Sequence, residues 1–159
     1  MLELKDVSVV FNEGTVNEKV ALNNINLALD KGDFVTIIGR NGAGKSTLFQ
    51  AISGAVDTKR GNIILNGRDI TFEPEYKRSK GIGRLFQDPL KGTAPNMTIE
   101  ENLHLSNQRG KHFSLSLTSH RHREEFKKAL MELELGLEER LDSKVGLLSG
   151  GQRQALTLL

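Results

Sequence analysis

Alternating apolar and polar residues open the chain and predict two strands. Residues 2–11 alternate up to a polar turn at residues 12–15, and residues 20–29 form a second alternating run. A period of two turns every second side chain to the same face of a sheet. Both runs therefore predict strands with a buried face, and the apolar positions of the second run include Leu22, Ile25 and Leu27.

A short apolar run and a helical segment follow, with a glycine-rich loop between them. Residues 34–38 are apolar except for Thr36 and come after a turn at residues 31–33. Such a run is typical of a strand that is buried on both faces of a sheet. Residues 45–52 predict a helix, which the loop at residues 39–44 joins to this strand.

Two further strands are predicted before residue 88. Residues 61–65 form the first, and the dipeptide Asn66-Gly67 that follows is a hairpin-type turn. Residues 81–86 form the second, which ends at residues 87–89.

The pattern becomes helical after Pro89. Thr98 followed by Glu101 predicts a capped helix start. Residues 123–135 predict a second helix that stops at Gly136, and residues 108–123 predict a surface loop. We therefore expect an α/β fold, with a mixed core over residues 1–88 and a mostly helical part over residues 89–159. The helical face of the second helix comprises Phe126, Ala129, Leu130 and Leu133.

Composition narrows the class of protein. A net charge of +2 over 159 residues gives a mixed surface, which argues against nucleic acid as the main partner. The absence of cysteine excludes disulfides and thiolate metal sites and fits a reducing compartment. No stretch approaches the roughly 20 apolar residues that cross a bilayer. We expect a cytoplasmic chain that takes part in a membrane process only by docking onto another polypeptide.

The loop at residues 39–46 carries the clearest chemistry. It matches G-x-x-x-x-G-K-[ST], the Walker A pattern that cradles phosphates. Its glycines allow successive backbone N–H groups to point inward at phosphate oxygens, and the helix that follows adds its positive end. Lys45 is expected to reach the β- and γ-phosphates, and the Ser46 hydroxyl to coordinate Mg²⁺. A glycine-rich turn that matches by accident is the alternative, at about one chain in a hundred.

A second anion-receiving element lies near residue 150. Residues 148–152 read Leu148-Ser149-Gly150-Gly151-Gln152, a serine and two flexible glycines at the start of a helix. The alternative is an ordinary helix N-cap. Together the two elements resemble the ATP-binding subunit of an ABC transporter, in which this signature motif contacts the γ-phosphate held by the other subunit of a head-to-tail dimer.

The resemblance covers essentially the whole chain and implies further roles. It implies a P-loop NTPase fold of the ABC type, with an antiparallel β subdomain and a helical subdomain, and with ATP and Mg²⁺ as cofactors. Gln87 matches the glutamine that approaches Mg²⁺ and senses the membrane partner, and Lys45 and Gln87 are the implied catalytic residues. Phe11 either stacks on adenine or is a core residue of its strand. The implied nucleotide-binding residues are Phe11, Gly39, Asn41, Gly42, Ala43, Gly44, Lys45, Ser46, Thr47, Ser149, Gly150, Gly151 and Gln152, and those for Mg²⁺ are Ser46 and Gln87.

The family pattern continues beyond the signature helix, to a Walker B strand that ends in Asp-Glu and to a switch histidine. Neither has a counterpart in this sequence. We therefore expect a fragment or a truncated product, which lacks the C-terminal strands of the fold. Such a chain holds the groups that grip ATP and lacks those that hydrolyse it.

The resemblance also implies partners. We expect an importer subunit on the inner face of the cell membrane, with a second nucleotide-binding subunit, separate transmembrane permease subunits and a substrate-binding protein. Residues 147–158 are similar to subunits grouped with amino-acid uptake, for tryptophan or tyrosine. A soluble ABC-type ATPase of DNA repair or translation is one alternative, and a module that binds ATP without hydrolysing it is another.

Two basic runs invite other interpretations. His120-Arg121-His122-Arg123 has two histidines without a nearby third ligand, so we interpret it as a solvated loop and not as a metal site. Lys77, Arg78 and Lys80 are likewise interpreted as a solvated face.

Overall fold

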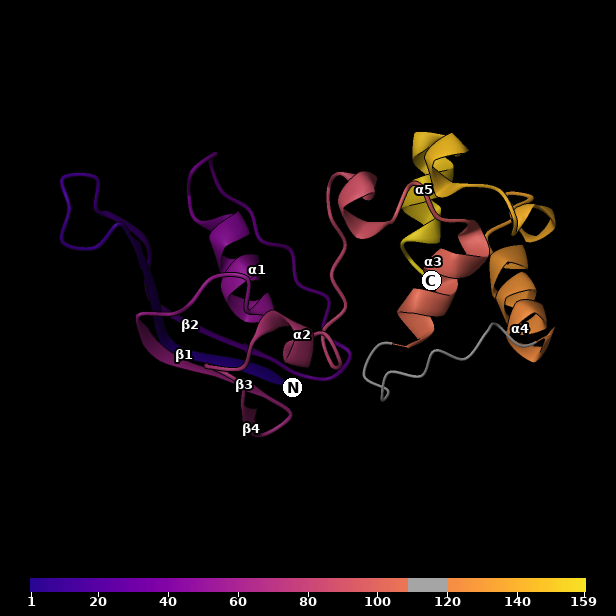
Figure 1. Ribbon diagram of the computed structural model, residues 1–159. Coiled ribbons are helices and arrows are strands. Elements are labelled where there is room, and N and C mark those ends of the chain that lie inside the picture. Colours follow the sequence, from indigo (N-terminus) through magenta and orange to yellow (C-terminus); the bar gives the residue numbers. More distant parts are fainter. Residues whose placement is uncertain (109–119) are drawn as a thin grey trace. The chain divides into compact units, whose positions relative to one another are not determined.

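The computed structural model describes residues 1–108 and 120–159 (Figure 1). These residues form two compact units, Met1–Ile82 and Gly83–Leu159, and each is described by itself. The division at residue 88 that the sequence indicated stays a prediction.

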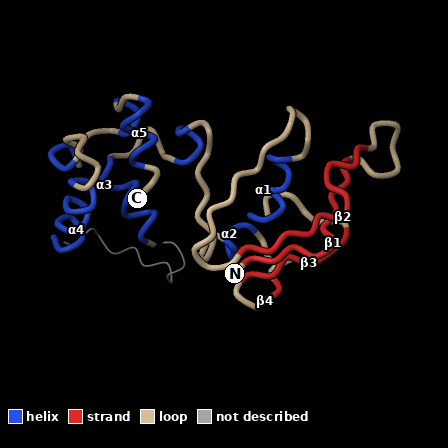
Figure 2. Tube along the Cα trace, turned by 180° about the vertical axis from the view of Figure 1, so that it is seen from behind, coloured by secondary structure: helices blue, strands red, loops and turns tan. Residues whose placement is uncertain are grey.

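The first unit contains an antiparallel sheet with the strand order β2-β1-β3-β4 (Figure 2). Strand β1 spans Leu2–Phe11, β2 Lys19–Leu29, β3 Arg60–Leu65 and β4 Arg68–Asp69. The strands expected at residues 2–11, 20–29 and 61–65 are therefore confirmed. The turn between β3 and β4 is also confirmed, because Asn66 and Gly67 have φ values of 51° and 79°, the left-handed conformation that such a hairpin requires.

A bulge in β1 changes which side chains face the core. Leu4 and Val7 are both buried although they are three positions apart, a spacing that places residues of a regular strand on opposite faces. Asp6 lies between them with a φ of 51°, and the register with β2 shifts there, so the alternation changes phase. The Asp6 N–H, which the bulge removes from the ladder, donates to Asn26 Oδ1 at 3.0 Å.

Helix α1 (Lys45–Ser53) covers one face of this sheet (Figures 1 and 2). Its buried side chains meet inward-facing residues of the strands and form a single apolar core. Burial of these side chains holds the helix, and with it the loop at residues 39–44, against the sheet. The buried core residues are Leu4, Val7, Val9, Leu22, Leu48, Ala51, Ile52, Ile63 and Ile70.

Two strand predictions are wrong for the described residues. Residues 34–38 and 81–86 form no strand. Phe34 and Ile38 are 95% and 89% exposed, whereas the sequence predicted a strand buried on both faces. An extended segment becomes a strand only by pairing, and no strand of the described residues pairs with either segment.

Arg78 corrects the interpretation of the basic run, because it is only 3% exposed. It ends the short helix α2 (Glu75–Arg78) and donates to four backbone carbonyls. Two of these, Ala51 O at 2.7 Å and Ile52 O at 3.0 Å, belong to the last turn of α1. Burial lowers the pKa of Arg78, and the carbonyl acceptors compensate the charge.

The second unit is helical, with α3 (Ile99–Asn107), α4 (His120–Met131) and α5 (Gly150–Leu156). Thr98 caps α3 through a capping box with Glu101, as predicted. Helix α4 ends four residues before the predicted end at Leu135, because the chain turns there and Glu134 has a φ of 53°. The buried core comprises Ile99, Leu103, Phe126, Leu130, Leu137, Leu141, Val145, Leu148 and Leu156.

The loop predicted at residues 108–123 is only partly described. Residues 109–119, with His112, lie outside the described residues. Residues 120–123 belong to α4, so the interpretation as a solvated loop is wrong there. His122 is half-buried, with its ring 6.0 Å from that of His104 and 6.3 Å from that of Phe126.

Backbone hydrogen bonds join two distant segments of the second unit. Val145 N donates to Met97 O at 3.0 Å and Gly146 N donates to Pro95 O at 2.8 Å. Arg123 adds an ionic link, since it pairs with Glu100 and with both carboxylate oxygens of Asp142, at 3.1 Å and 2.6 Å. The segment that leads to α5 is therefore held against the start of α3. None of the described helices is both long enough and apolar enough to cross a membrane.

Replacement of Arg78 by Met is expected to lower the free energy of unfolding by about 3 kcal/mol, because four carbonyls lose their donor in a buried place. Urea denaturation measures this value. Arg68→Met is the matched control, since the Arg68 side chain is 74% exposed and its pair with Glu73 contributes less than about 1 kcal/mol. Equal losses of unfolding free energy in the two variants would contradict a stabilising role for the four Arg78 hydrogen bonds.

The Asp142 pair predicts a pH dependence. The hydrogen bond from Arg123 lowers the pKa of Asp142, so the pair stabilises the fold above the unfolded-state pKa of about 4 and the contribution disappears as the pH falls through the folded-state pKa. Melting temperatures of Asp142→Asn should lie below those of the wild type at pH 7, and the gap should close toward pH 3. Glu139→Gln is the control, and a gap for Asp142→Asn that does not change with pH would contradict the pairing.

Candidate functional site

The Walker A residues form an exposed loop before α1. Residues 39–43 are exposed, and Ala43 N donates to Arg40 O at 3.1 Å in a tight turn. Gly42 and Gly44 have φ values of 82° and 88°, a conformation that side chains rarely adopt. The predicted helix after the loop is confirmed, because α1 begins at Lys45.

Helix α1 differs from α3 and α5 at its N-terminus. Thr98 and Ser149 cap α3 and α5 with their side chains in capping boxes, whereas Gly44 occupies the N-cap of α1 and makes no side-chain hydrogen bond. The first turn of α1 also has no acidic residue. The backbone N–H groups at the start of a helix need acceptors and carry partial positive charge. The loop therefore leaves these groups to an acceptor from outside, and an anion is suited to that position.

Lys45 reaches back over the loop that precedes it. Its Nζ donates to Gly39 O at 2.6 Å and to Arg40 O at 2.8 Å. An ammonium group has three donors, so one N–H remains for a further acceptor. The neighbouring Ser46 and Asn41 are exposed, and Thr47 is partly exposed. The Lys45 ammonium and the uncapped N-terminus of α1 therefore lie at the same loop.

Gly44 lies where the loop passes closest to the sheet. A Cβ built on it would be 2.6 Å from Ala21 O and 3.1 Å from Leu22 Cδ2. No side chain fits that space without moving the backbone of β2, so glycine is required by the approach as well as by its φ of 88°. The contact between Gly44 and β2 thus fixes the distance of the Walker A loop from the apolar core.

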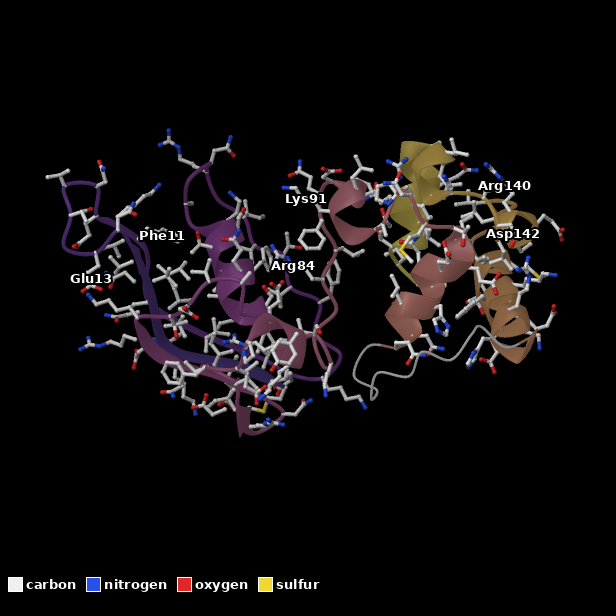
Figure 3. All side chains as sticks on the ribbon, viewed as in Figure 1. Phe11, Glu13, Arg84, Lys91, Arg140 and Asp142 are labelled. Carbon is white, nitrogen blue, oxygen red and sulfur yellow. The ribbon has the colours of Figure 1, made fainter. Side chains whose placement is uncertain are left out.

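Phe11 ends strand β1, opposite Lys19 (Figure 3). Its side chain is partly buried and packs against the core of the first unit. The contact agrees with a core residue of the strand, and stacking on a base stays a prediction. Gln87 belongs to the second unit, where it is exposed at a bend before the short 3-10 helix η1 (Pro89–Gly92), and its approach to Mg²⁺ stays a prediction.

The signature residues begin α5. Ser149 Oγ accepts from Gln152 N at 3.2 Å, and Gln152 Oε1 accepts from Ser149 N at 3.2 Å. A Cβ on Gly150 or Gly151 would meet nothing within 4 Å, so both glycines present open backbone. The N-cap that was the alternative interpretation is therefore present, and it leaves the backbone of Gly150 and Gly151 accessible.

Asn102 and Arg153, which the sequence analysis did not single out, bind backbone groups of the segments that lead to α3 and α5. Asn102 accepts from Ala94 N at 2.8 Å and donates to Ala94 O and Thr98 O at 3.1 Å and 2.8 Å. Arg153 donates to carbonyls of the turn before Ser149. Neither role has a signal in the local pattern, because each depends on which backbone groups the fold brings near.

Comparison with known proteins places these elements in one family. The family profile described as ABC transporter matches residues 22–159. The tyrosine transport ATP-binding protein of Clostridioides difficile is 40% identical over 159 residues, which cover 100% of this chain and 63% of that protein. The xylose/arabinose import ATP-binding protein of Sulfolobus acidocaldarius is 35% identical, over 99% of this chain and 59% of that protein. The chain thus spans about three fifths of the length of these relatives.

Solved structures agree in fold. A dimeric ATP-binding cassette in a post-hydrolysis state, bound to ADP and phosphate, matches with a TM-score of 0.81 at 27% identity and covers 99% of this chain and 67% of its own. A dimeric bacterial ABC transporter cassette matches with a TM-score of 0.80 at 28% identity. The predicted ABC-type α/β fold is therefore confirmed, and the chain belongs to the ABC transporter family.

Proposed function

We propose that this chain is the nucleotide-binding part of an ABC importer subunit, which couples ATP binding and hydrolysis to the uptake of a solute. The observation that carries the proposal is the uncapped first turn of α1 behind the Walker A loop, with Lys45 turned over that loop. Membership of the ABC transporter family supports ATP as the ligand.

The loop residues fit the phosphates of ATP. The free N–H groups of α1 and the Lys45 ammonium provide donors and positive charge for phosphate oxygens. Ser46 lies at the second position of α1 with an exposed hydroxyl, the ligand type that Mg²⁺ takes from a P-loop. Gln87 is proposed as a second group for Mg²⁺, and Lys45 and Gln87 as the residues of this chain that act in hydrolysis.

The signature residues are proposed to complete a site in a second copy. Ser149, Gly150 and Gly151 present a hydroxyl and open backbone at the start of α5. One triphosphate needs only one P-loop, so a second phosphate-directed element has a use when two chains meet head to tail. Two of the matched solved cassettes are dimeric, which supports this arrangement. ATP would then favour the closed pair and its hydrolysis the open one.

The remaining partners follow from the importer assignment. We propose separate transmembrane permease subunits and a substrate-binding protein, with this chain on the cytoplasmic face of the cell membrane. The relative named for xylose/arabinose import supports import. The 40% identity to the tyrosine system favours an amino acid as the solute.

Replacement of Lys45 by Ala is expected to weaken ATP binding at least about tenfold and to leave adenosine binding unchanged, because only the phosphates use the loop. Titration with a fluorescent ATP analogue, with adenosine as competitor, measures both affinities. Lys31→Ala removes a charge from an exposed turn of the same unit and should alter neither. Equal loss for ATP and adenosine in Lys45→Ala would count against the assignment.

Replacement of Gly44 by Ala is expected to displace the loop from β2 and to weaken ATP binding at least about tenfold, because the added Cβ would be 2.6 Å from Ala21 O. Gly32→Ala is the matched control: Gly32 has a φ of 97° but nothing within 4 Å of its Cβ position. It should cost about 1 kcal/mol of stability through backbone strain and leave ATP binding intact. Unchanged binding in Gly44→Ala would contradict the proposed role of this close approach.

A further inference from the structure

Arg153 makes an unusual set of contacts for a partly exposed side chain. Its Nε donates to Val145 O at 3.3 Å, and its Nη2 donates to Gly146 O and to Leu148 O, both at 3.1 Å. All three acceptors belong to the turn around the 3-10 helix η3 (Val145–Leu147), which leads directly to Ser149. The guanidinium thus bonds to three backbone carbonyls of the turn that precedes the signature residues.

The direction of the side chain follows from helix geometry. In an α-helix each Cα–Cβ bond is tilted toward the N-terminus, so a long side chain on the fourth residue of α5 extends past Ser149. Its positive charge therefore lies at the positive end of the helix, where the helix dipole disfavours it. Hydrogen bonds to three carbonyls offset this unfavourable interaction with the helix dipole. The positive charge of Arg153 therefore stays next to residues 149–151.

The turn is held from its other side by backbone alone. The N–H groups of Val145 and Gly146 donate to Met97 O and Pro95 O. A Cβ on Gly146 would be 2.9 Å from Pro95 O, so the two segments are in close contact. With the N–H groups of Val145 and Gly146 bonded to residues 95–97 and three carbonyls of the turn bonded to Arg153, the turn that leads to Ser149 is held on both sides.

We propose that Arg153 is a positioning residue of the signature element: it holds the 145–148 turn so that Ser149 and the backbone of Gly150 and Gly151 face the γ-phosphate bound by a second copy of the chain. This inference rests on the composite ATP site proposed above. Arg153 acts through the backbone of the turn and the field at the start of α5.

The planar fork of the guanidinium is suited to this task. Its N–H groups diverge in fixed directions and meet three carbonyls that point from different residues of one turn. A lysine ammonium concentrates its donors at one point, so it keeps the charge and only part of the contacts. Glutamine loses both the charge and the reach.

The first experiment compares amide hydrogen exchange in the wild type, Arg153→Gln and Arg153→Lys. In Arg153→Gln the amides of Leu148 and Gln152, which bond within the turn and its cap, should exchange at least about tenfold faster. Arg153→Lys should be intermediate. Arg140, which is labelled in Figure 3, belongs to the same unit but lies outside the turn. Arg140→Gln is therefore the control and should leave the exchange of both amides unchanged. Unchanged protection in Arg153→Gln would overturn the proposal.

The second experiment separates ATP binding from ATP-driven association. Titration with a fluorescent ATP analogue should give Arg153→Gln the wild-type affinity, because the loop at residues 39–46 is not altered. Sedimentation with ATP should show association at least about tenfold weaker than in the wild type, with partial rescue in Arg153→Lys. Association of Arg153→Gln as strong as that of the wild type would overturn the positioning role. A loss of nucleotide affinity as large as the loss of association would overturn it too.

Different results would contradict the composite ATP site and the positioning role of Arg153. If the wild-type chain binds no ATP, or binds ATP without associating, the proposed function or its composite site fails, and the exchange data still decide whether Arg153 orders the turn. If the wild type associates with ATP and the exchange of Leu148 and Gln152 does not depend on Arg153, only the positioning role fails.

Discussion

The first turn of α1 carries backbone N–H groups for which no side chain of the described residues provides a cap, and the proposed nucleotide site depends on this constraint. Glycine at the N-cap removes a side chain that could fold back, and its positive φ brings the loop against β2. The sheet holds α1 through the apolar core, so the open helix end and Lys45 face the same loop. In the proposed site, a phosphate supplies the acceptors and the negative charge that this end lacks.

The second unit uses the opposite device at α5. There Ser149 and Gln152 satisfy the helix start with their own side chains, while Gly150 and Gly151 keep its backbone open. The turn before it is bound to residues 95–97 through two of its N–H groups and to Arg153 through three of its carbonyls. The proposed role of this element, contact with a phosphate held by a second copy, benefits from such order, because fixing the turn in advance lowers the entropy lost on association.

Patterns local in the sequence predicted the elements that depend on local interactions. The β1 strand, the Asn66-Gly67 turn, the start of α1 and the Thr98 cap were all confirmed, since alternation, turn chemistry and capping act within a few residues. The strand at residues 34–38 was not, because an apolar run forms a strand only beside a partner. Arg78 was assigned to a solvated face for a related reason: its four carbonyl acceptors come from residues up to 27 positions away.

The sequence by itself determined the family and the loop and signature residues of the proposed site, because glycines and a lysine at fixed spacing encode a backbone shape and a charge. Tertiary structure alone decided how closely Gly44 approaches β2, where a Cβ would be 2.6 Å from Ala21 O. It also decided which arginines bind backbone carbonyls and which remain exposed. The physical reason is that a long side chain takes its partners from whatever groups folding brings within reach, and the linear pattern carries no record of those distances.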